Sequence, residues 1–411
     1  MNLMMNIALR LTLTIAVVLT AFPMSGENLF TTLLGKDREE VDRRIDDLWH
    51  HFFTPGDLDR YDRDGEKSVY YLSDDGMAFI MDTGNNDVRT EGMSYGMMIS
   101  VQLDRRDEFD RLWSWSKANM AYDKSTPWDG YFCWQCDAEG NKIGNSNASD
   151  GELYYVTSLL LAGQRWDEPL YTDEANAILH KIMNKNGEAT GVYNLFNSDN
   201  YMITFVPDRG GYYFTDPSYH LPAFLQMWSA TAADNRDFWA KAASASRSHL
   251  IDAAHPVTGL YPDYSNYDGS PFRWKYSGYD TSMYMYDAIR CAMNVGMDYY
   301  LTGEDKERQT DGMRRLLRFF KNDGFRHSRF TLDGKYSEGE YSVGMAGANA
   351  VAAFALASSD DEADRELAKE YVQRLWDVEP PTGKYRYYEG MVYFLSMLHV
   401  SGHFSLDFRN K

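Results

Sequence analysis

The sequence predicts an all-α fold, an (α/α)6 barrel in which six outer helices surround six inner helices. Three observations favour this fold class. The spacing of apolar residues is helical nearly throughout residues 27–411. Charged amphipathic segments alternate strictly with segments that are apolar on most faces. The loops before the apolar segments are long and rich in Tyr, Trp, Asp and Gly, which is typical of loops that carry function.

The helices are predicted in chain order from these two kinds of segment. Each outer segment has charged residues on one side and apolar residues on the other, as expected of a helix with one face in water. Each inner segment is rich in small and apolar residues, such as EGMSYGMMISVQL from Glu91. Pro217 supports the third inner start, because proline is favoured in the first turn. The predicted outer helices are Asp37–Phe53, Asp107–Met120, Thr172–Met183, Arg236–Ile251, Asp305–Phe320 and Asp361–Trp376, and the inner helices that follow them start near Glu91, Asp150, Tyr219, Asp287, Val343 and Tyr388.

The inner helices of such a barrel run parallel, so all six inner starts should lie at the same end. A solenoid of helical hairpins would show the same alternation, but it requires a recurring motif, and this sequence has none. No Pro- or Ser-rich linker divides residues 27–411. We therefore predict a single large domain over residues 27–411.

Residues 1–26 have the pattern of a signal peptide. Arg10 is the only charge before an apolar run from Leu11 to Phe22, and the small residues Ser25 and Gly26 follow. The run is too short for a comfortable membrane span. We therefore expect an exported protein, periplasmic or secreted, without a membrane anchor.

The charge balance narrows the partners. The chain has 61 acidic and 41 basic side chains, a net charge of −20. Nucleic acids and anionic membranes require a basic face, so neither is an expected partner. Aromatic residues make up 15% of the chain, and a surface rich in aromatics and carboxylates suits a neutral ligand with many hydroxyls.

Two short motifs resemble metal sites without completing one. Cys133 and Cys136 have CxxC spacing, but no second pair or His cluster accompanies them, so we expect buried thiols. The acidic stretch from Asp57 to Gly65 has Tyr61 where an EF-hand loop needs an acid or amide. We predict no metal.

Carboxylates occur at four successive inner-helix starts, namely Glu91, Asp150, Asp216 and Asp287. Each alone could be a capping acid stabilised by the helix dipole. A parallel barrel, however, directs all four toward one pocket, where like charges push pKa values apart and separate an acid from a base. The apolar residues next to Glu91 would also desolvate it and raise its pKa, as a general acid requires.

One protonated and one ionised carboxyl beside a hydroxyl-rich ring are the groups that hydrolyse glycosides. No paired Ser–His–Asp arrangement, HExxH, Walker loop or dinucleotide fingerprint offers another chemistry. Aromatic residues in the same loops would stack on sugar rings. The candidates are Trp128, Tyr131, Phe132, Trp134, Tyr212, Tyr213, Trp274, Tyr385 and Tyr387.

The stretch DVRTEGMSYGMM around Glu91 resembles the signature of glycoside hydrolase family 8. The resemblance covers roughly residues 30–405 and is greatest to the reducing-end xylose-releasing exo-oligoxylanases of that family. It implies an (α/α)6 barrel that hydrolyses β-1,4-xylosidic bonds with inversion, acts on xylo-oligosaccharides or xylan, and needs no cofactor. The supporting stretches are LDRRDEFDRLWSW, GYFCWQC, SDGELYYVTSLLLAGQRW, FTDPSYHLPAF, HPVTGLYPDYSNYDGSP and GKYRYYEGMVYFLSML.

The resemblance also implies a role for individual residues. Glu91 corresponds to the general acid and Asp287 to the general base. Tyr219 should hold the attacking water, Arg290 should orient the base, and Asp150 should grip and distort the sugar. The further predicted substrate-binding residues are Arg89, Tyr95, Trp134, Tyr131, Tyr341 and Tyr387.

The sequence departs from the exo-oligoxylanases before the fifth inner helix. They carry a Leu-His pair that closes the site beyond the reducing-end sugar, whereas Tyr341 stands here in the His position and His327 lies upstream. An endo-acting family 8 xylanase, cellulase or chitosanase is therefore an alternative. A non-catalytic sugar-binding protein would need no acid–base pair, and an (α/α)6 polysaccharide lyase would need basic residues for its anionic substrate. We expect a monomer.

Overall fold

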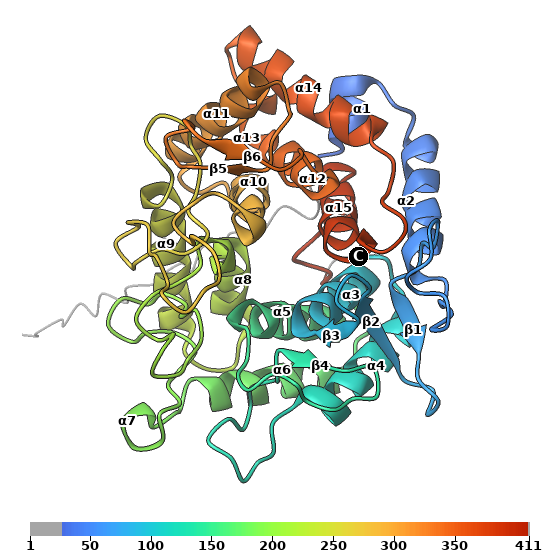
Figure 1. The fold of residues 1–411 in the computed structure, drawn as a ribbon, viewed down its shortest axis with the longest axis vertical. Helices are drawn as coiled ribbons and strands as arrows, with labels where there is room; N and C mark the ends of the chain where they lie inside the picture. Colours follow the sequence, from blue (N-terminus) through green and yellow to red (C-terminus); the bar gives the residue numbers. More distant parts are fainter. Residues whose placement is uncertain (1–26, 410–411) are drawn as a thin grey trace, which may run out of the picture.

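A ring of parallel helices forms the centre of the molecule in a computed structural model, which describes residues 27–409 (Figure 1). Each inner helix packs against the next, and the last packs against the first, so the ring is closed. The predicted signal peptide lies outside the described residues. The inner helices are α3 (Thr90–Gln102), α5 (Ser149–Arg165), α8 (Pro222–Thr231), α10 (Arg290–Thr302), α12 (Val343–Ala352) and α15 (Arg386–Val400).

A second ring of helices surrounds the first (Figure 1). Each outer helix packs mainly on one inner helix, and the pairs are α2 with α15, α4 with α3, α6 with α5, α9 with α8, α11 with α10, and α14 with α12. This confirms the predicted (α/α)6 barrel. The outer helices are α2 (Arg38–Phe53), α4 (Arg106–Trp115), α6 (Pro169–Ile182), α9 (Arg236–Asp252), α11 (Lys306–Asp323) and α14 (Glu362–Asp377).

The two kinds of helix differ in burial as their sequences predict. In α11, the buried apolar residues Met313, Leu316, Leu317 and Phe320 recur at helical spacing while the rest of the helix is mostly charged. In α3, every residue except Glu91 is buried. The inner ring therefore forms the core of the barrel, and Glu91 is the one residue of α3 that is partly exposed.

Several short elements lie outside the two rings. A π-helical turn, η1 (Ser116–Met120), extends α4, and one turn of 3₁₀ helix precedes each of α8 and α10. The all-α prediction missed a four-stranded antiparallel sheet in the order β1-β2-β3-β4 and a two-stranded one, because strands of two to five residues are too short to show alternation. These elements are α1 (Leu29–Leu34), α7 (Gly187–Thr190), α13 (Phe354–Ala357), η2 (Pro217–Tyr219), η3 (Tyr286–Ile289), β1 (Tyr70–Leu72), β2 (Ala78–Asp82), β3 (Asp87–Arg89), β4 (Gln135–Cys136), β5 (Arg329–Phe330) and β6 (Ser337–Glu338).

Two inner helices begin later than the sequence predicts. Tyr219 lies in η2, and α8 starts only at Pro222, because a residue before proline is disfavoured in the helical region and Leu221 accordingly lies outside it (φ −121°, ψ 69°). Asp287 likewise lies in η3, before α10. Both side chains are therefore carried by short turns at the mouth of the barrel.

The loops are long at one end of the barrel and short at the other. The chain passes from α3 to α4 through residues 103–105 and from α10 to α11 through residues 303–305. The connections that lead into the inner helices are much longer, for example residues 121–148 between η1 and α5. Because the inner helices are parallel, these long loops gather around their N-terminal ends. None of the helices within residues 27–409 is long and apolar enough to cross a membrane.

Candidate active site

A cavity of about 800 Å³ opens at the N-terminal ends of the inner helices, which is a typical size for a ligand site. Its walls combine carboxylates with aromatic rings. Among residues 27–409, no group of three or more His, Cys, Asp or Glu side chains is placed to hold a metal ion. Of the predicted site residues, Arg89, Glu91, Trp134, Asp150, Tyr219, Asp287 and Tyr387 line this cavity.

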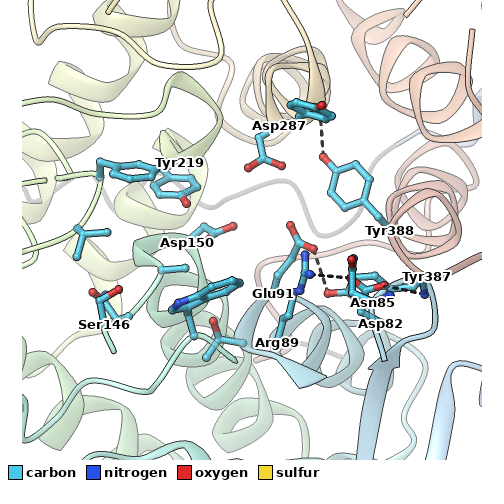
Figure 2. Close-up of a pocket in the computed structure, with 18 of the residues that line it drawn as sticks. Asp82, Asn85, Arg89, Glu91, Ser146, Asp150, Tyr219, Asp287, Tyr387 and Tyr388 are labelled. Atoms are coloured by element: carbon cyan, nitrogen blue, oxygen red, sulfur yellow. Dashed lines mark hydrogen bonds and ion pairs between the residues drawn. The ribbon is translucent and has the colours of Figure 1, made fainter. Parts of the chain in front are cut away.

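Glu91 lies where strand β3 passes directly into α3. The Trp134 carbonyl accepts a hydrogen bond from the backbone N–H of Thr90 (3.0 Å), which fixes the start of the helix against the neighbouring loop. Two side chains then hold the Glu91 carboxyl: the Tyr387 hydroxyl donates to Oε1 (3.0 Å) and Arg290 Nη1 donates to Oε2 (3.1 Å). Glu91 is therefore held from both sides while its edge faces the cavity (Figure 2).

Arg290, in the first turn of α10, lies beneath the cavity floor and is 2% exposed. Its Nη1 donates to Asp150 Oδ2 (2.7 Å) and to the Tyr95 hydroxyl (2.6 Å), as well as to Glu91. Its Nη2 donates to Ser218 Oγ (2.9 Å) and lies 3.3 Å from Asp287 Oδ2. One guanidinium thus contacts three carboxylates from three different inner-helix starts.

These charges do not balance if all three carboxylates are ionised, because they share the single charge of Arg290 and Arg89 adds only a weaker effect on Glu91. Burial raises the pKa of Glu91 to about 8; the Arg290 charge opposes this shift, and the charges of Asp287 and Asp150 add to it. Burial likewise raises the pKa of Asp150, again against Arg290. Glu91 therefore holds a proton at neutral pH.

Asp287 faces Glu91 from the opposite side of the cavity, with Asp150 and Tyr219 to one side of the gap (Figure 2). Its side chain is 33% exposed, twice as much as that of Glu91 at 16%. Because both carboxyls contact the same planar guanidinium, the contacting oxygens can be at most about 9 Å apart. Both carboxyls line the same cavity.

Arg89 and Trp134 form the wall beside Glu91. The Arg89 guanidinium donates to Asp87 (2.9 and 3.2 Å) and lies 3.2 Å from Asp82, which fixes its position. It also lies over the Trp134 ring, 5.6 Å from the centroid. Arg89 and Trp134, both predicted to bind substrate, therefore line the cavity as a packed pair.

Three of the residues predicted to bind substrate do not line the cavity. Tyr95 is buried, and its hydroxyl accepts from Arg290, so it supports the floor from below. Tyr131 is fully buried, and its hydroxyl contacts the Tyr193 carbonyl (2.9 Å) and the Ile182 carbonyl at the end of α6 (3.3 Å) as a donor. Tyr341 lies in a separate groove between α12 and α14, where its hydroxyl accepts from Asn349 (2.9 Å). His327, upstream of Tyr341, pairs with Asp323 (2.7 Å) and also lies away from the cavity.

The fourth predicted acid and most of the aromatic candidates also lie outside the cavity lining. Asp216 is fully buried and caps η2 through Ser218 N (2.7 Å), so it does not line the cavity. Trp274 and Tyr385 line the cavity, whereas Trp128, Phe132, Tyr212 and Tyr213 do not. Sequence reasoning missed Asp82, Asn85, Phe205, Tyr264, Tyr279, Tyr286 and Tyr388. Tyr286 and Tyr388 adjoin the predicted residues Asp287 and Tyr387, so the sequence could have indicated them. No sequence pattern marks the other five.

Glu152 joins two of the loops that form the cavity wall. It lies one half-turn after Asp150 in α5 and is fully buried. Its Oε1 accepts from the backbone N–H of Phe132 (3.0 Å) and its Oε2 from Asn147 Nδ2 (2.9 Å). Burial raises the pKa of Glu152 to about 8. Through these bonds α5 holds the segments that carry Trp134 and Asn147.

Replacing Glu152 with Ala should therefore lower the free energy of unfolding by about 1–3 kcal/mol, because a buried N–H loses its acceptor. Glu152→Gln keeps an acceptor for Phe132 N–H and should cost less. Urea unfolding of both variants tests this, with limited proteolysis of residues 121–148 as a local readout. Equal stability and equal protease resistance of Glu152→Ala and the parent protein would contradict the role.

Comparison with known proteins gives a matching family and several similar relatives. The family model "Glycosyl hydrolases family 8" matches residues 67–402. A reducing-end xylose-releasing exo-oligoxylanase from Halalkalibacterium halodurans is 37% identical over 390 residues, covering 93% of this chain and 94% of the relative. Endoglucanase 2 from Ruminiclostridium josui is 26% identical over a region that covers 78% of this chain and 65% of that relative.

Solved structures agree with the fold. Rex8A from Paenibacillus barcinonensis complexed with xylose superposes with a TM-score of 0.82 at 34% identity, covering 92% of this chain and 97% of that one. A xylohexaose complex of a catalytic mutant xylanase from Teredinibacter turnerae gives a TM-score of 0.83 at 37% identity, with the same 92% and 97% coverage.

Proposed function

The chain belongs to glycoside hydrolase family 8, and from this premise we propose that it hydrolyses β-1,4-xylosidic bonds with inversion, releasing xylose from the reducing end of xylo-oligosaccharides. The exo-oligoxylanase relative supports this substrate, because it matches more of the chain at higher identity than the endoglucanase does. The observation that carries the proposal is the pair formed by Glu91 and Asp287 on opposite sides of the cavity, joined through Arg290.

The two carboxyls would divide the reaction between them. Glu91, protonated at neutral pH, would give its proton to the glycosidic oxygen as the bond to the sugar breaks. Asp287, the more exposed of the two, would take a proton from a water molecule that attacks the anomeric carbon from the opposite face. Tyr219 would hold that water, and Asp150 would bind the sugar at the cleavage point. The upper limit of about 9 Å between the carboxyls leaves room for the separation of roughly 6.5–9.5 Å that inversion uses.

The pH dependence follows from the state of Glu91. A general acid works only while it is protonated, so activity should be lost as the pH rises through the Glu91 pKa of about 8. We expect kcat/KM to fall about tenfold per pH unit on the alkaline side. Rates measured from pH 6 to pH 10, with the melting temperature recorded at each pH as the control for unfolding, test this. A rate that stays constant up to pH 10 would contradict the assignment.

Endo-hydrolysis of xylan is the second candidate, and the position of Tyr341 favours it. This residue stands where the exo-oligoxylanases have their blocking His, yet it lies outside the cavity, with its ring against Phe320 and Phe325. The xylanase from Teredinibacter turnerae is also among the similar solved structures. Exo action therefore requires that another part of the cavity wall limits the chain beyond the reducing-end sugar.

The products of xylohexaose labelled at its reducing end separate the two candidates. Exo action predicts labelled xylose and unlabelled xylopentaose as the first products, whereas endo action predicts labelled xylobiose or longer. The anomeric form of the new reducing end, followed by NMR, should be α for inversion. Release of the β-anomer first would reject the mechanism, and no cleavage at all would reject the substrate.

Export and a monomeric state complete the proposal. The charged start, the apolar run and the small residues before position 27 support cleavage near that position. The mass of the mature protein recovered from an exporting host, together with its size by light scattering, tests both.

A further inference from the structure

Two buried carboxyls, Asp216 and Asp263, lie behind Asp287. They are 0% and 1% exposed. Among residues 27–409, no Lys, Arg or His forms an ion pair with either, and each has one oxygen without a hydrogen-bond partner, Oδ2 of Asp216 and Oδ1 of Asp263. Asp298 shows the usual alternative: it is equally buried but accepts two bonds from Arg247 (2.6 and 2.7 Å). A buried carboxylate without a cation is costly, so Asp216 and Asp263 need another explanation.

The backbone brings these two acids together between the turns that carry Tyr219 and Asp287. Thr215 and Ser265 exchange two backbone hydrogen bonds (both 3.0 Å), which pairs the segment of Asp216 with that of Asp263. The Asp263 N–H then donates to the Met283 carbonyl (2.8 Å), in the segment that leads into η3. Asp263 is thus held on one side to the η2 segment and on the other to the η3 segment.

The Asp263 carboxyl also makes contacts toward the cavity. The Tyr279 hydroxyl and the backbone N–H of Asp287 act on it as hydrogen-bond donors. Tyr279 lines the cavity, and its ring lies 4.8 Å from that of Tyr286. Asp263 therefore connects a cavity-lining hydroxyl with the turn of Asp287.

The surroundings of the pair favour its neutral form. Burial raises the pKa of Asp263 well above its ordinary value, and the charges of Asp216 and Asp287 add to the shift. Burial does the same to Asp216, with Asp287 adding to the shift and Arg290 opposing it. The titratable and charged groups that face the pair are Asp287, Tyr219, Tyr264, Tyr279, Arg290 and Cys291. Of these, only Arg290 is positive, and it is already shared among three carboxylates.

We propose that Asp263 is a positioning residue for the reaction, a protonated carboxyl that fixes the turn of Asp287 and the hydroxyl of Tyr279. This inference rests on the proposed function, in which Asp287 activates water. A neutral carboxyl holds the turn by hydrogen bonds without adding a negative charge beside Asp287. An added charge would favour the protonated, inactive form of the base.

Asp263→Asn and Asp263→Ala distinguish this role from a merely structural one. The amide of Asn has the shape and neutrality of the protonated carboxyl, so Asp263→Asn should keep kcat on xylohexaose within about threefold, with the acidic limb of its pH profile unchanged. Asp263→Ala releases the turn, and kcat should fall about 100-fold at nearly constant KM. Asp298→Asn is the matched control: it should lower the melting temperature and leave kcat and the pH profile unchanged, because Asp298 belongs to an ion pair with Arg247.

Stability measured against pH tests the proton independently of activity. The folded protein keeps the Asp263 proton that the unfolded chain loses above its ordinary pKa, so stability declines as the pH rises from about 4 toward the folded-state pKa. Asp263→Asn removes this titration. Its urea midpoint relative to the parent protein should therefore increase between pH 4 and pH 7.

Each result has a definite meaning. A loss in Asp263→Asn as large as in Asp263→Ala, with a shifted acidic limb, would show that a charge is needed and would overturn the proposal. A parent-like kcat in Asp263→Ala would overturn it as well, as would a midpoint difference that does not change with pH. If the parent protein cleaves no xyloside while the midpoint difference still rises with pH, the proposed function fails and the protonated state of Asp263 stands.

Discussion

The variant Glu91→Gln should lose about 10²- to 10⁴-fold in kcat on xylo-oligosaccharides while remaining folded, because the amide cannot protonate the leaving oxygen. The fold should survive, since the amide oxygen of a Gln at this position can still accept from Arg290 while its N–H donates to the Tyr387 hydroxyl oxygen. Initial rates on xylotriose, with circular dichroism and melting temperature as folding controls, measure the effect. Wild-type turnover in this variant would remove Glu91 from the reaction.

A substrate that needs no acid identifies the step that Glu91 serves. Fluoride leaves without a full proton, so Glu91→Gln should act on a β-xylobiosyl fluoride far better, relative to the parent enzyme, than it acts on xylotriose. Asp287→Asn is the matched variant: it should be slow on both substrates, because water must be activated in either case. The reverse pattern would exchange the two roles.

Replacing Arg290 with Met should have the second large effect, on stability and on activity together. The change leaves Glu91, Asp150 and Asp287 without the cation that all three contact. Removing one partner of a buried ion pair typically costs about 3–5 kcal/mol, and part of that loss will appear here as uptake of protons by the carboxyls. Because a base must be ionised to work, the acidic limb of kcat/KM should move to higher pH. Urea unfolding and a pH–rate profile measure the two effects.

Arg247→Met separates this electrostatic effect from loss of a buried arginine in general. Arg247 pairs with the buried Asp298 at the interface of α9 and α10, away from the cavity. The Arg247→Met variant should lower the free energy of unfolding by a comparable amount and leave the acidic limb of the pH–rate profile unchanged. An unchanged limb in Arg290→Met would contradict the view that its charge governs the site.

Much of the fold was predictable because the sequence of each helix reflects whether that helix is buried or faces water. A buried helix such as α3 must be apolar on nearly every face, and an outer helix such as α11 must not, so the alternation is visible residue by residue. The starts of α8 and α10 were predicted too early, because the sequence of Tyr219 and Asp287 is compatible with a first turn. Only the chain conformation around Pro222 and the tight turn of η3 decide the matter.

The site was predictable where it depends on helix starts and was missed where it depends on distant loops. Glu91, Asp150 and Asp287 each begin an inner element, and parallel packing alone brings them together. Asp82 and Tyr279 reach the cavity from a strand end and from an irregular loop. Asp216, predicted to join the pocket, turns inward because its carboxyl accepts from Ser218 N. No local pattern encodes these orientations, which arise from contacts between segments far apart in the chain.

The closure of the inner ring determines when activity can appear. Glu91 is held by Tyr387, a residue 296 positions later on the last inner helix. A ribosome that has made α3, α5 and α10 has produced the three carboxyls that Arg290 contacts but not the hydroxyl that holds Glu91. A nascent chain should therefore be catalytically silent until α15 emerges, and the many contacts between distant segments should make its folding slow. Truncation before α15 should abolish activity even where the remaining helices stay compact.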